Sequence, residues 1–320
     1  MDDTRAVPAT DDLVQPFQLD TLAARGRLVR LGPVLDRILG YHDYPPPVAR
    51  LLAEALVLAA VMSDVFKYDG IFTLQAKGDG LIRLLVADVT TDGGMRGYVQ
   101  FDRDRLAALA IADAGADAGD AEASVPRLLG SGYLAFTVDQ GAEMERYQGI
   151  VDLDGATLAD CAHRYFRQSQ QLEAVVKLAV ARAQGGDGRW RAGAIMVQRI
   201  GRQGIQGIAG APVDEEAEDG WRRAVILMGS ATTAELADLA LHPHRLLYRL
   251  FHEDGVRVFD PALLRMECRC TPERVRTMLR SFPRRELDEF LIDDALEVTC
   301  EFCSQKYRFD VATLDGLYCV

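Results

Sequence analysis

The stretch Ile71-Phe72-Thr73-Leu74-Gln75-Ala76 decides the fold class, because its β-branched and aromatic residues favour an extended strand. It is followed by the turn Gly78-Asp79-Gly80 and by a second apolar run at residues 81–87. Two extended runs separated by a glycine-containing turn are typical of a β-hairpin. The stretch and its surroundings therefore predict an antiparallel pair of strands.

Similar patterns recur along the first 200 residues. Residues 175–181 and 194–200 flank a Gly-Gly-Asp-Gly turn at residues 185–188, which predicts a second hairpin. Residues 47–64, which begin with proline and are rich in Ala and Leu, predict a largely buried helix, and residues 158–171 predict another. Further strands are expected at residues 98–101, 133–138 and 147–153. We therefore expect an α+β fold in which helices pack on a core of antiparallel sheet.

The chain is expected to divide into three parts. Residues 1–200 would form the N-terminal α+β core domain, with residues 1–16 frayed at its start. Residues 201–260 would form a flexible and helical linker region, and residues 261–320 a small C-terminal module. Within residues 201–220, glycines at every third position precede a run of acidic residues, which favours a flexible, solvated linker over a phosphate-binding loop.

The later part of the linker region carries helix signals. Thr232 and Glu235 have the spacing of a capping box, and Pro243 stands where a first helical residue is expected. Apolar residues after Pro243 cluster on one helical face. The sequence therefore predicts helices between the core domain and the C-terminal module.

Composition and charge limit the classes of function. The chain has 320 residues, of which 49% are hydrophobic, and 48 acidic against 36 basic residues give a net charge of −12. A chain this acidic is poorly suited to general binding of nucleic acid or anionic membranes. The amino terminus lacks the pattern of a signal peptide, and the longest apolar run, residues 51–62, is too short to span a bilayer. We therefore expect a soluble, cytoplasmic protein.

Four cysteines near the carboxyl end carry the clearest chemical pattern. Cys268-Arg269-Cys270 is followed after 29 residues by Cys300-Glu301-Phe302-Cys303, and five of the six cysteines lie after residue 267. In a reducing compartment such clustering indicates metal or redox chemistry rather than a disulfide framework. Two close pairs can supply a tetrahedral zinc site with four thiolates, and adjacent thiolates are also suited to oxidation. Spacing alone leaves an inert zinc ribbon open, and an all-thiolate site could also hold iron.

The residues between and after the cysteine pairs predict a small folded module. Thr271 and Pro272 would begin a first short helix, Pro283 a second, and residues 305–309 alternate as a strand would. The apolar residues expected on the inner faces of the helices are Val275, Met278, Leu279, Leu287, Phe290 and Leu291. Such a module has too small a core to fold alone, so the metal is expected to supply the missing stability.

Two other classes of function fit less well. A zinc-ribbon nucleic-acid binder is favoured by seven arginines against two glutamates at residues 265–285, but residues 262–320 as a whole carry nine basic and eleven acidic residues. We expect these arginines to be solvated or to face an acidic partner such as residues 214–219. A zinc hydrolase or deaminase needs an open coordination position, which four thiolates do not leave. The five histidines match no motif of such enzymes, so no catalytic residue is expected.

Segments outside the cysteine pairs add a more specific pattern. These are His42-Asp43-Tyr44-Pro45, Met95-Arg96-Gly97, Gly130-Ser131-Gly132-Tyr133, Arg146-Tyr147-Gln148-Gly149 and Tyr165-Phe166-Arg167-Gln168-Ser169-Gln170-Gln171. Together with the C-x-C and C-x-x-C pairs, they resemble the heat-shock-protein-33 family of redox-regulated chaperones, in the family's order. The resemblance covers nearly the whole chain and is weakest in residues 1–16 and 201–220. Gln170 departs from the pattern, because the family usually has an acidic residue there.

The resemblance implies an ATP-independent holdase that is inactive while it is reduced and zinc-bound. Oxidation together with unfolding stress would form the disulfides Cys268–Cys270 and Cys300–Cys303, release zinc and unfold the C-terminal segment. The linker region would then expose surface that binds unfolding client proteins. The resemblance also implies a homodimer in the oxidised state.

Apolar residues of the linker region are the candidates for this client-binding surface. They are Val225, Ile226, Leu227, Leu236, Leu239, Leu246, Leu247, Leu250 and Phe251. The sequence leaves open whether each of them simply packs on the core domain or forms latent client surface. Cys161 and Cys319 lie outside the cysteine pattern; we expect Cys161 to be a buried helix residue and Cys319 to be incidental.

Overall fold

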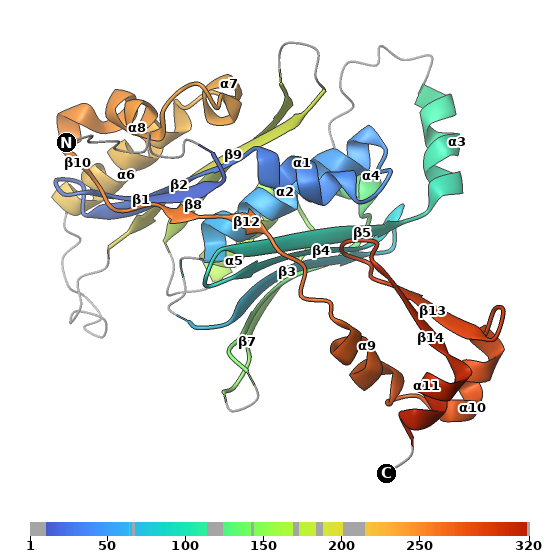
Figure 1. The fold of residues 1–320 in the computed structure, drawn as a ribbon. Coiled ribbons are helices and arrows are strands. Elements are labelled where there is room, and N and C mark those ends of the chain that lie inside the picture. The colour runs from blue at the N-terminus through green and yellow to red at the C-terminus, as the bar shows by residue number, and fades with distance from the viewer. Residues whose placement is uncertain are drawn as a thin grey trace, which may run out of the picture.

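The computed structural model of the protein describes residues 11–63, 65, 68–113, 124–141, 144–168, 173–183, 188–200 and 215–318. Its strands form two large sheets and a small C-terminal hairpin, with helices on and between the sheets (Figure 1). All strand pairs but one are antiparallel among the described residues. The structure thus confirms the α+β prediction.

The first sheet has the strand order β10-β1-β2-β9-β8. Its strands are β1 (Leu13–Leu19), β2 (Ala24–Leu31), β8 (Ala174–Arg182), β9 (Trp190–Arg199) and β10 (Val256–Val258), and β11 (Ala262–Leu263) also pairs with β1. The second predicted hairpin is β8 with β9, although residues 184–187 of its turn lie outside the described residues. The prediction of a frayed start is wrong for residues 13–16, because β1 is paired on both sides and residues 13–15 are buried.

The second sheet has the strand order β12-β5-β4-β3-β6-β7. Its strands are β3 (Ile71–Gly78), β4 (Ile82–Thr90), β5 (Gly94–Phe101), β6 (Gly132–Asp139), β7 (Tyr147–Asp152) and β12 (Arg265–Met266). The hairpin expected at residues 71–87 is formed by β3 and β4. The short strand β12 runs parallel to β5, so residues 265–266 extend this sheet just before the first cysteine pair.

The helix α2 (Pro46–Ser63) lies between the two sheets and forms the centre of the core (Figure 1). Helices α1 (Pro33–Gly40) and α5 (Leu158–Gln168) pack near it, while α3 (Arg103–Asp113) and α4 (Val125–Leu128) lie between β5 and β6 in the chain. Within the described part of the chain, α2 alone is long and apolar enough to cross a membrane by length and composition. Because 78% of it is buried inside the protein, its apolar composition is explained by packing between the sheets.

The linker helices cover the face of the first sheet that points away from α2. They are α6 (Glu215–Gly229), α7 (Thr233–Ala237) and α8 (Pro243–Phe251), followed by the 3₁₀ turn η1 (His252–Asp254). The predicted capping box of Thr232 and Glu235 is present, and Pro243 occupies the first turn of α8. The expected flexible linker is wrong for residues 215–220, which are helical, and residues 201–214 lie outside the described residues.

The C-terminal module lies on the opposite face of the second sheet from α2 (Figure 1). It contains α9 (Pro272–Leu279), α10 (Arg284–Leu287), the 3₁₀ turn η2 (Asp288–Phe290), β13 (Ala295–Thr299), β14 (Lys306–Asp310) and α11 (Val311–Gly316). Its core consists of Val275, Leu279, Leu287, Leu296, Phe309, Leu314 and Leu317. Two expected core residues are not inside, because Met278 is 41% and Phe290 66% exposed.

The boundaries expected at residues 200 and 260 stay predictions. Strand pairing shows how the parts are joined, because β10 and β11 pair with β1 of the first sheet and β12 pairs with β5 of the second. The segment that leads to the first cysteine pair is therefore built into the sheets of the core.

A buried histidine gives the core a testable pH dependence. The backbone N–H of Val176 in β8 donates to Nε2 of His163 in α5 at 2.9 Å, and burial lowers the pKa of His163. The folded protein therefore resists a proton that the unfolded chain accepts near its ordinary pKa of about 6.5. This contribution to stability is complete above that pH and falls as the pH decreases towards the folded pKa.

We expect the free energy of unfolding, measured with urea, to fall between neutral pH and about pH 5 and to fall less in His163→Gln. His252→Gln, at an exposed histidine, serves as the control and should follow the parent protein. An unchanged pH profile in His163→Gln would show that His163 is not the titrating group.

Candidate metal centre

The four cysteines of the two pairs meet at one point. Cys268 and Cys270 follow β12, while Cys300 and Cys303 lie in the turn between β13 and β14. All four Sγ atoms lie within 4.8 Å of one another. The Sγ of Cys268 is 3.4 Å from that of Cys270 and 3.6 Å from that of Cys300, and the sulfurs of Cys270 and Cys303 are 3.4 Å apart.

These distances fit a tetrahedral thiolate site. Zinc–sulfur bonds of about 2.3 Å at tetrahedral angles place the sulfurs roughly 3.8 Å apart. A disulfide requires about 2.05 Å, which is much shorter than any of the three distances. The cysteines are therefore arranged as free thiols gathered around one position. The donor set of four sulfurs fits zinc, and it fits iron by the same chemistry.

Electrostatics favours a bound cation at this cluster. Burial and hydrogen bonding with the other three sulfurs raise the pKa of Cys303, because a negative charge there would be poorly solvated and repelled. A bound divalent cation reverses this effect and stabilises the thiolates. The hydroxyl of Tyr307 in β14 also donates to the Sγ of Cys270 at 3.1 Å, which orients that sulfur.

The turn that carries Cys300 and Cys303 has a backbone conformation that brings their two sulfurs together. The N–H of Cys300 donates to the carbonyl of Gln305 at 2.9 Å, and the N–H of Ser304 donates to the carbonyl of Cys300 at 2.8 Å. Ser304 adopts a left-handed φ of 56°, which reverses the chain just after Cys303. The β13–β14 hairpin therefore presents both sulfurs on one side.

The client-binding candidates lie mainly against the first sheet. Leu236, Leu246, Leu247, Leu250 and Phe251 are buried, while Val225, Leu227 and Leu239 are half-buried. Their apolar cluster includes Phe17, Leu28, Ile195 and Val197 of the sheet. Ile226 differs from the other candidates, because it is 71% exposed and so is not covered by the sheet.

Two residues of the first sheet that the sequence did not single out hold the linker helices. The guanidinium of Arg30, which has no exposed surface, donates to the carbonyl oxygens of Glu235, Asp238 and Leu241. Burial lowers the pKa of Arg30 to about 10. Gly193 is paired with Arg30 and lies directly under the carbonyl of Leu236. The sequence signal for Arg30 was an arginine within the otherwise apolar run at residues 28–31.

The remaining cysteines and Gln170 are outside the cluster or outside the described residues. Cys161 is buried in α5, as expected, and burial raises the pKa of its thiol to about 11, which disfavours the reactive thiolate. Cys319 and Gln170 lie outside the described residues.

The arginines of the module are largely paired with nearby acids. Arg276 pairs with Glu273, Arg284 with Asp288 and Asp315, Arg265 with Asp92 and Glu267, and Arg269 with Asp88. These pairs agree with the expectation of acidic partners. Two residues of the suggested run 214–219 have other partners, because Glu218 pairs with Arg199 and Asp219 with Arg222.

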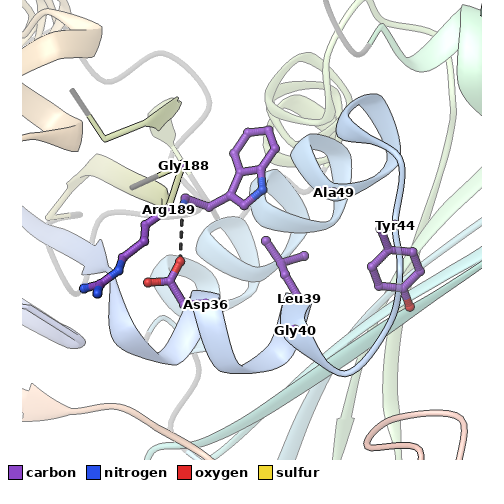
Figure 2. Close-up of a pocket in the computed structure, with 8 residues that line it drawn as sticks. Asp36, Leu39, Gly40, Tyr44, Ala49, Gly188 and Arg189 are labelled. Carbon is purple, nitrogen blue, oxygen red and sulfur yellow. Dashed lines mark hydrogen bonds between the residues drawn. The ribbon is translucent and has the colours of Figure 1, made fainter. Parts of the chain in front are cut away.

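A pocket of about 330 Å³ lies away from the cysteines, beside α1 and α2 (Figure 2). Asp36 on its wall accepts hydrogen bonds from the backbone N–H of Trp190 and from Arg191, both at 3.1 Å. Tyr44 accepts one from the N–H of Val99 at 3.0 Å, and burial raises its pKa to about 12. Asp36 thus connects α1 to β9 of the first sheet, and Tyr44 connects the loop before α2 to β5 of the second. The pocket is therefore a feature of how these elements pack.

Comparisons with known proteins agree with this geometry. A family model described as Hsp33 protein matches residues 12–310. A protein of Caulobacter vibrioides called 33 kDa chaperonin is 42% identical over 94% of this chain and 95% of its own, and one of Pseudomonas fluorescens with the same name is 34% identical over 96% and 93%. The crystal structure of a 33 kDa chaperonin from Thermotoga maritima matches with a TM-score of 0.76 at 22% identity, covering 96% of this chain and 97% of that one. The chain therefore belongs to the Hsp33 family.

Proposed function

We propose that this protein is a redox-regulated, ATP-independent holdase of the cytoplasm, without catalytic activity of its own. The relatives are chaperonins by name, which supports the chaperone function. The observation that supports the redox switch is the gathering of four free cysteines, with all sulfurs within 4.8 Å of one another, on a module with a small core. In the reduced form, Cys268, Cys270, Cys300 and Cys303 would hold zinc.

The chemical step is the pairing of cysteine sulfurs. Two thiolates lose two electrons as one sulfur–sulfur bond forms, and peroxide takes up these electrons with two protons to give two waters. We infer the pairs Cys268–Cys270 and Cys300–Cys303, in which the partners are close in sequence. A paired sulfur no longer carries the charge with which it binds a cation, so oxidation leaves the cluster unable to hold zinc.

Loss of the metal has a large effect on so small a module. Bound structural zinc contributes apparent binding energies of about 10–16 kcal/mol in small domains, while whole domains are stable by only about 5–15 kcal/mol. Seven buried apolar side chains form the core of the module. Oxidation would therefore unfold residues 268–318.

Unfolding of the module would release the linker helices. The chain between Phe251 and Cys268 runs through β10, β11 and β12, which pair with both sheets and connect the module to α8. Helices that leave the first sheet would uncover Phe17, Leu28 and Ile195, together with their own apolar faces. Exposed apolar surface of this kind binds unfolding client proteins. A homodimer of the oxidised form would cover part of that surface, and neither nucleic acid nor membrane is expected as a partner.

The function is tested with a heat-denatured client protein whose aggregation is followed by light scattering. We expect protein oxidised with peroxide at elevated temperature to suppress aggregation and the reduced, zinc-loaded protein to suppress it far less. Full suppression by the reduced form would contradict the switch, and no suppression by either form would contradict the chaperone function.

A further inference from the structure

A row of polar residues crosses the open face of the second sheet below the cysteine cluster. Thr73 in β3, Asp88 in β4 and Arg96 in β5 lie directly opposite one another in the strand register. Oγ1 of Thr73 donates to Oδ1 of Asp88 at 2.7 Å, and Nε of Arg96 donates to Oδ2 at 2.8 Å. The side chain of Asp88 is only 5% exposed, so these partners replace the water that would otherwise solvate the carboxylate.

The residues inside both cysteine pairs contact this row. Arg269, between Cys268 and Cys270, donates from Nη2 to the same Oδ2 of Asp88. Phe302, between Cys300 and Cys303, lies with its ring 3.8 Å from the guanidinium carbon of Arg96. The ring of Tyr98, next on this face of β5, meets Phe302 edge-on at 4.8 Å. The second sheet therefore contacts each cysteine pair through a residue that lies between the two cysteines of that pair.

The contact of Arg269 depends on the state of the enclosing sulfurs. Its backbone lies within the ring that a Cys268–Cys270 disulfide would close. The two sulfurs are 3.4 Å apart in this structure and must approach to about 2.05 Å to bond. Because the side chain of Arg269 is only 14% exposed and directed at one carboxylate, a change in the enclosing backbone moves the guanidinium off its partner.

We propose that Asp88 is a positioning residue of the redox switch. It holds Arg269, fixes Cys268 and Cys270 in their reduced arrangement against the second sheet, and loses this ion pair when the two sulfurs bond. The proposal rests on the redox function above. By linkage, a contact made only in the reduced state stabilises that state, so its removal must favour the disulfide by the same factor.

The test compares Asp88→Asn with the parent protein, both as the full chain. Each is equilibrated with a series of glutathione buffers at a fixed, buffered zinc concentration. In each equilibrium Cys268 and Cys270 lose two electrons as thiolates and form their disulfide. One glutathione disulfide gains these two electrons and takes two protons from the solvent to give two glutathiones. The fraction of this disulfide is read by mass spectrometry after alkylation. We expect the disulfide to be favoured about tenfold in Asp88→Asn. This corresponds to a midpoint reduction potential about 30 mV more negative than that of the parent protein.

A second measurement reports docking without any oxidation. Amide hydrogen exchange of the reduced, zinc-loaded protein should be about tenfold faster within residues 272–299 in Asp88→Asn than in the parent protein. Arg269→Gln should behave like Asp88→Asn, and Arg269→Lys, which keeps the charge but not the planar fork, should fall in between. These two variants change a residue outside the core sheets, so they remain informative if Asp88→Asn folds poorly.

Asp92→Asn is the matched control. The Arg265–Asp92 pair joins the same segment to the same sheet, but its side chains are 50% and 67% exposed. An exposed pair contributes little, so this variant should change neither readout. Equal midpoints and exchange rates in the parent, Asp88→Asn and Arg269→Gln would overturn the proposal even if oxidation activates the chaperone. A shifted midpoint in a protein that never prevents aggregation would instead refute the proposed function and leave the role of Asp88 intact.

Discussion

Gly193→Ala is expected to loosen the linker helices and to give the reduced protein holdase activity without oxidation. A Cβ at Gly193 would lie 2.1 Å from the backbone oxygen of Leu236 and 2.7 Å from its carbonyl carbon. Both atoms belong to the backbone of α7, so the clash is relieved only if the helix moves away from the first sheet. Overpacking of this kind costs about 1–3 kcal/mol, which makes release of the helices about 5- to 150-fold more frequent.

The measurement is amide hydrogen exchange of residues 233–251 in the reduced protein, together with the client aggregation assay. Gly229→Ala is the control, because a Cβ there meets nothing within 4 Å. Arg30→Met removes the donors to three carbonyl oxygens of the same segment and should act in the same direction. Faster exchange without any gain in client binding would show that the helices do not cover the client surface.

Removal of zinc is expected to unfold the C-terminal module while the two large sheets stay folded. Because the core cluster of the module has only seven apolar residues, the module would depend on the cross-link that a bound metal makes between Cys268, Cys270 and the β13–β14 hairpin. Cys268→Ser removes one of four thiolates, and an even share of the binding energy corresponds to about 70- to 900-fold weaker zinc binding. Zinc affinity is measured by competition with a chelator.

Folding of the module is followed in the same samples by hydrogen exchange in β13 and β14. Cys161→Ala is the matched control, because it removes a cysteine buried in α5 and should leave zinc affinity unchanged. Parent-like zinc affinity in Cys268→Ser would remove Cys268 from the ligand set, and a zinc-free module that keeps its exchange protection would show that its apolar core suffices.

Elements with strong local patterns could be predicted from the sequence. The turn of the β3–β4 hairpin is specified by three residues, and the cysteines of the candidate metal site come as two local pairs. The opening strands were missed, because β1 is held by partners as distant as Val258 and Leu263, which no local pattern reveals. The spacing of apolar residues likewise predicted that Phe290 packs in the core of the module. It is exposed instead, because the module has no further layer of structure to cover it.

The contacts that join the parts could not be predicted. Asp88 and Arg269 are 181 residues apart, and Arg30 binds carbonyl oxygens more than 200 residues away. Alternation along a strand predicts which face of the sheet a side chain lies on. The partner that the side chain contacts depends on how the module and the helices pack on the sheets. Sequence therefore identified the four cysteines that cluster and left their attachment to the core unknown.

The most direct test follows bound zinc, free thiols and client binding in one sample during oxidation by peroxide at elevated temperature. We expect zinc and four thiols per chain to be lost together, with holdase activity rising in step. Activity that appears while all four sulfurs remain reduced and the metal remains bound would contradict a switch based on the exchange of thiolate ligands for disulfides.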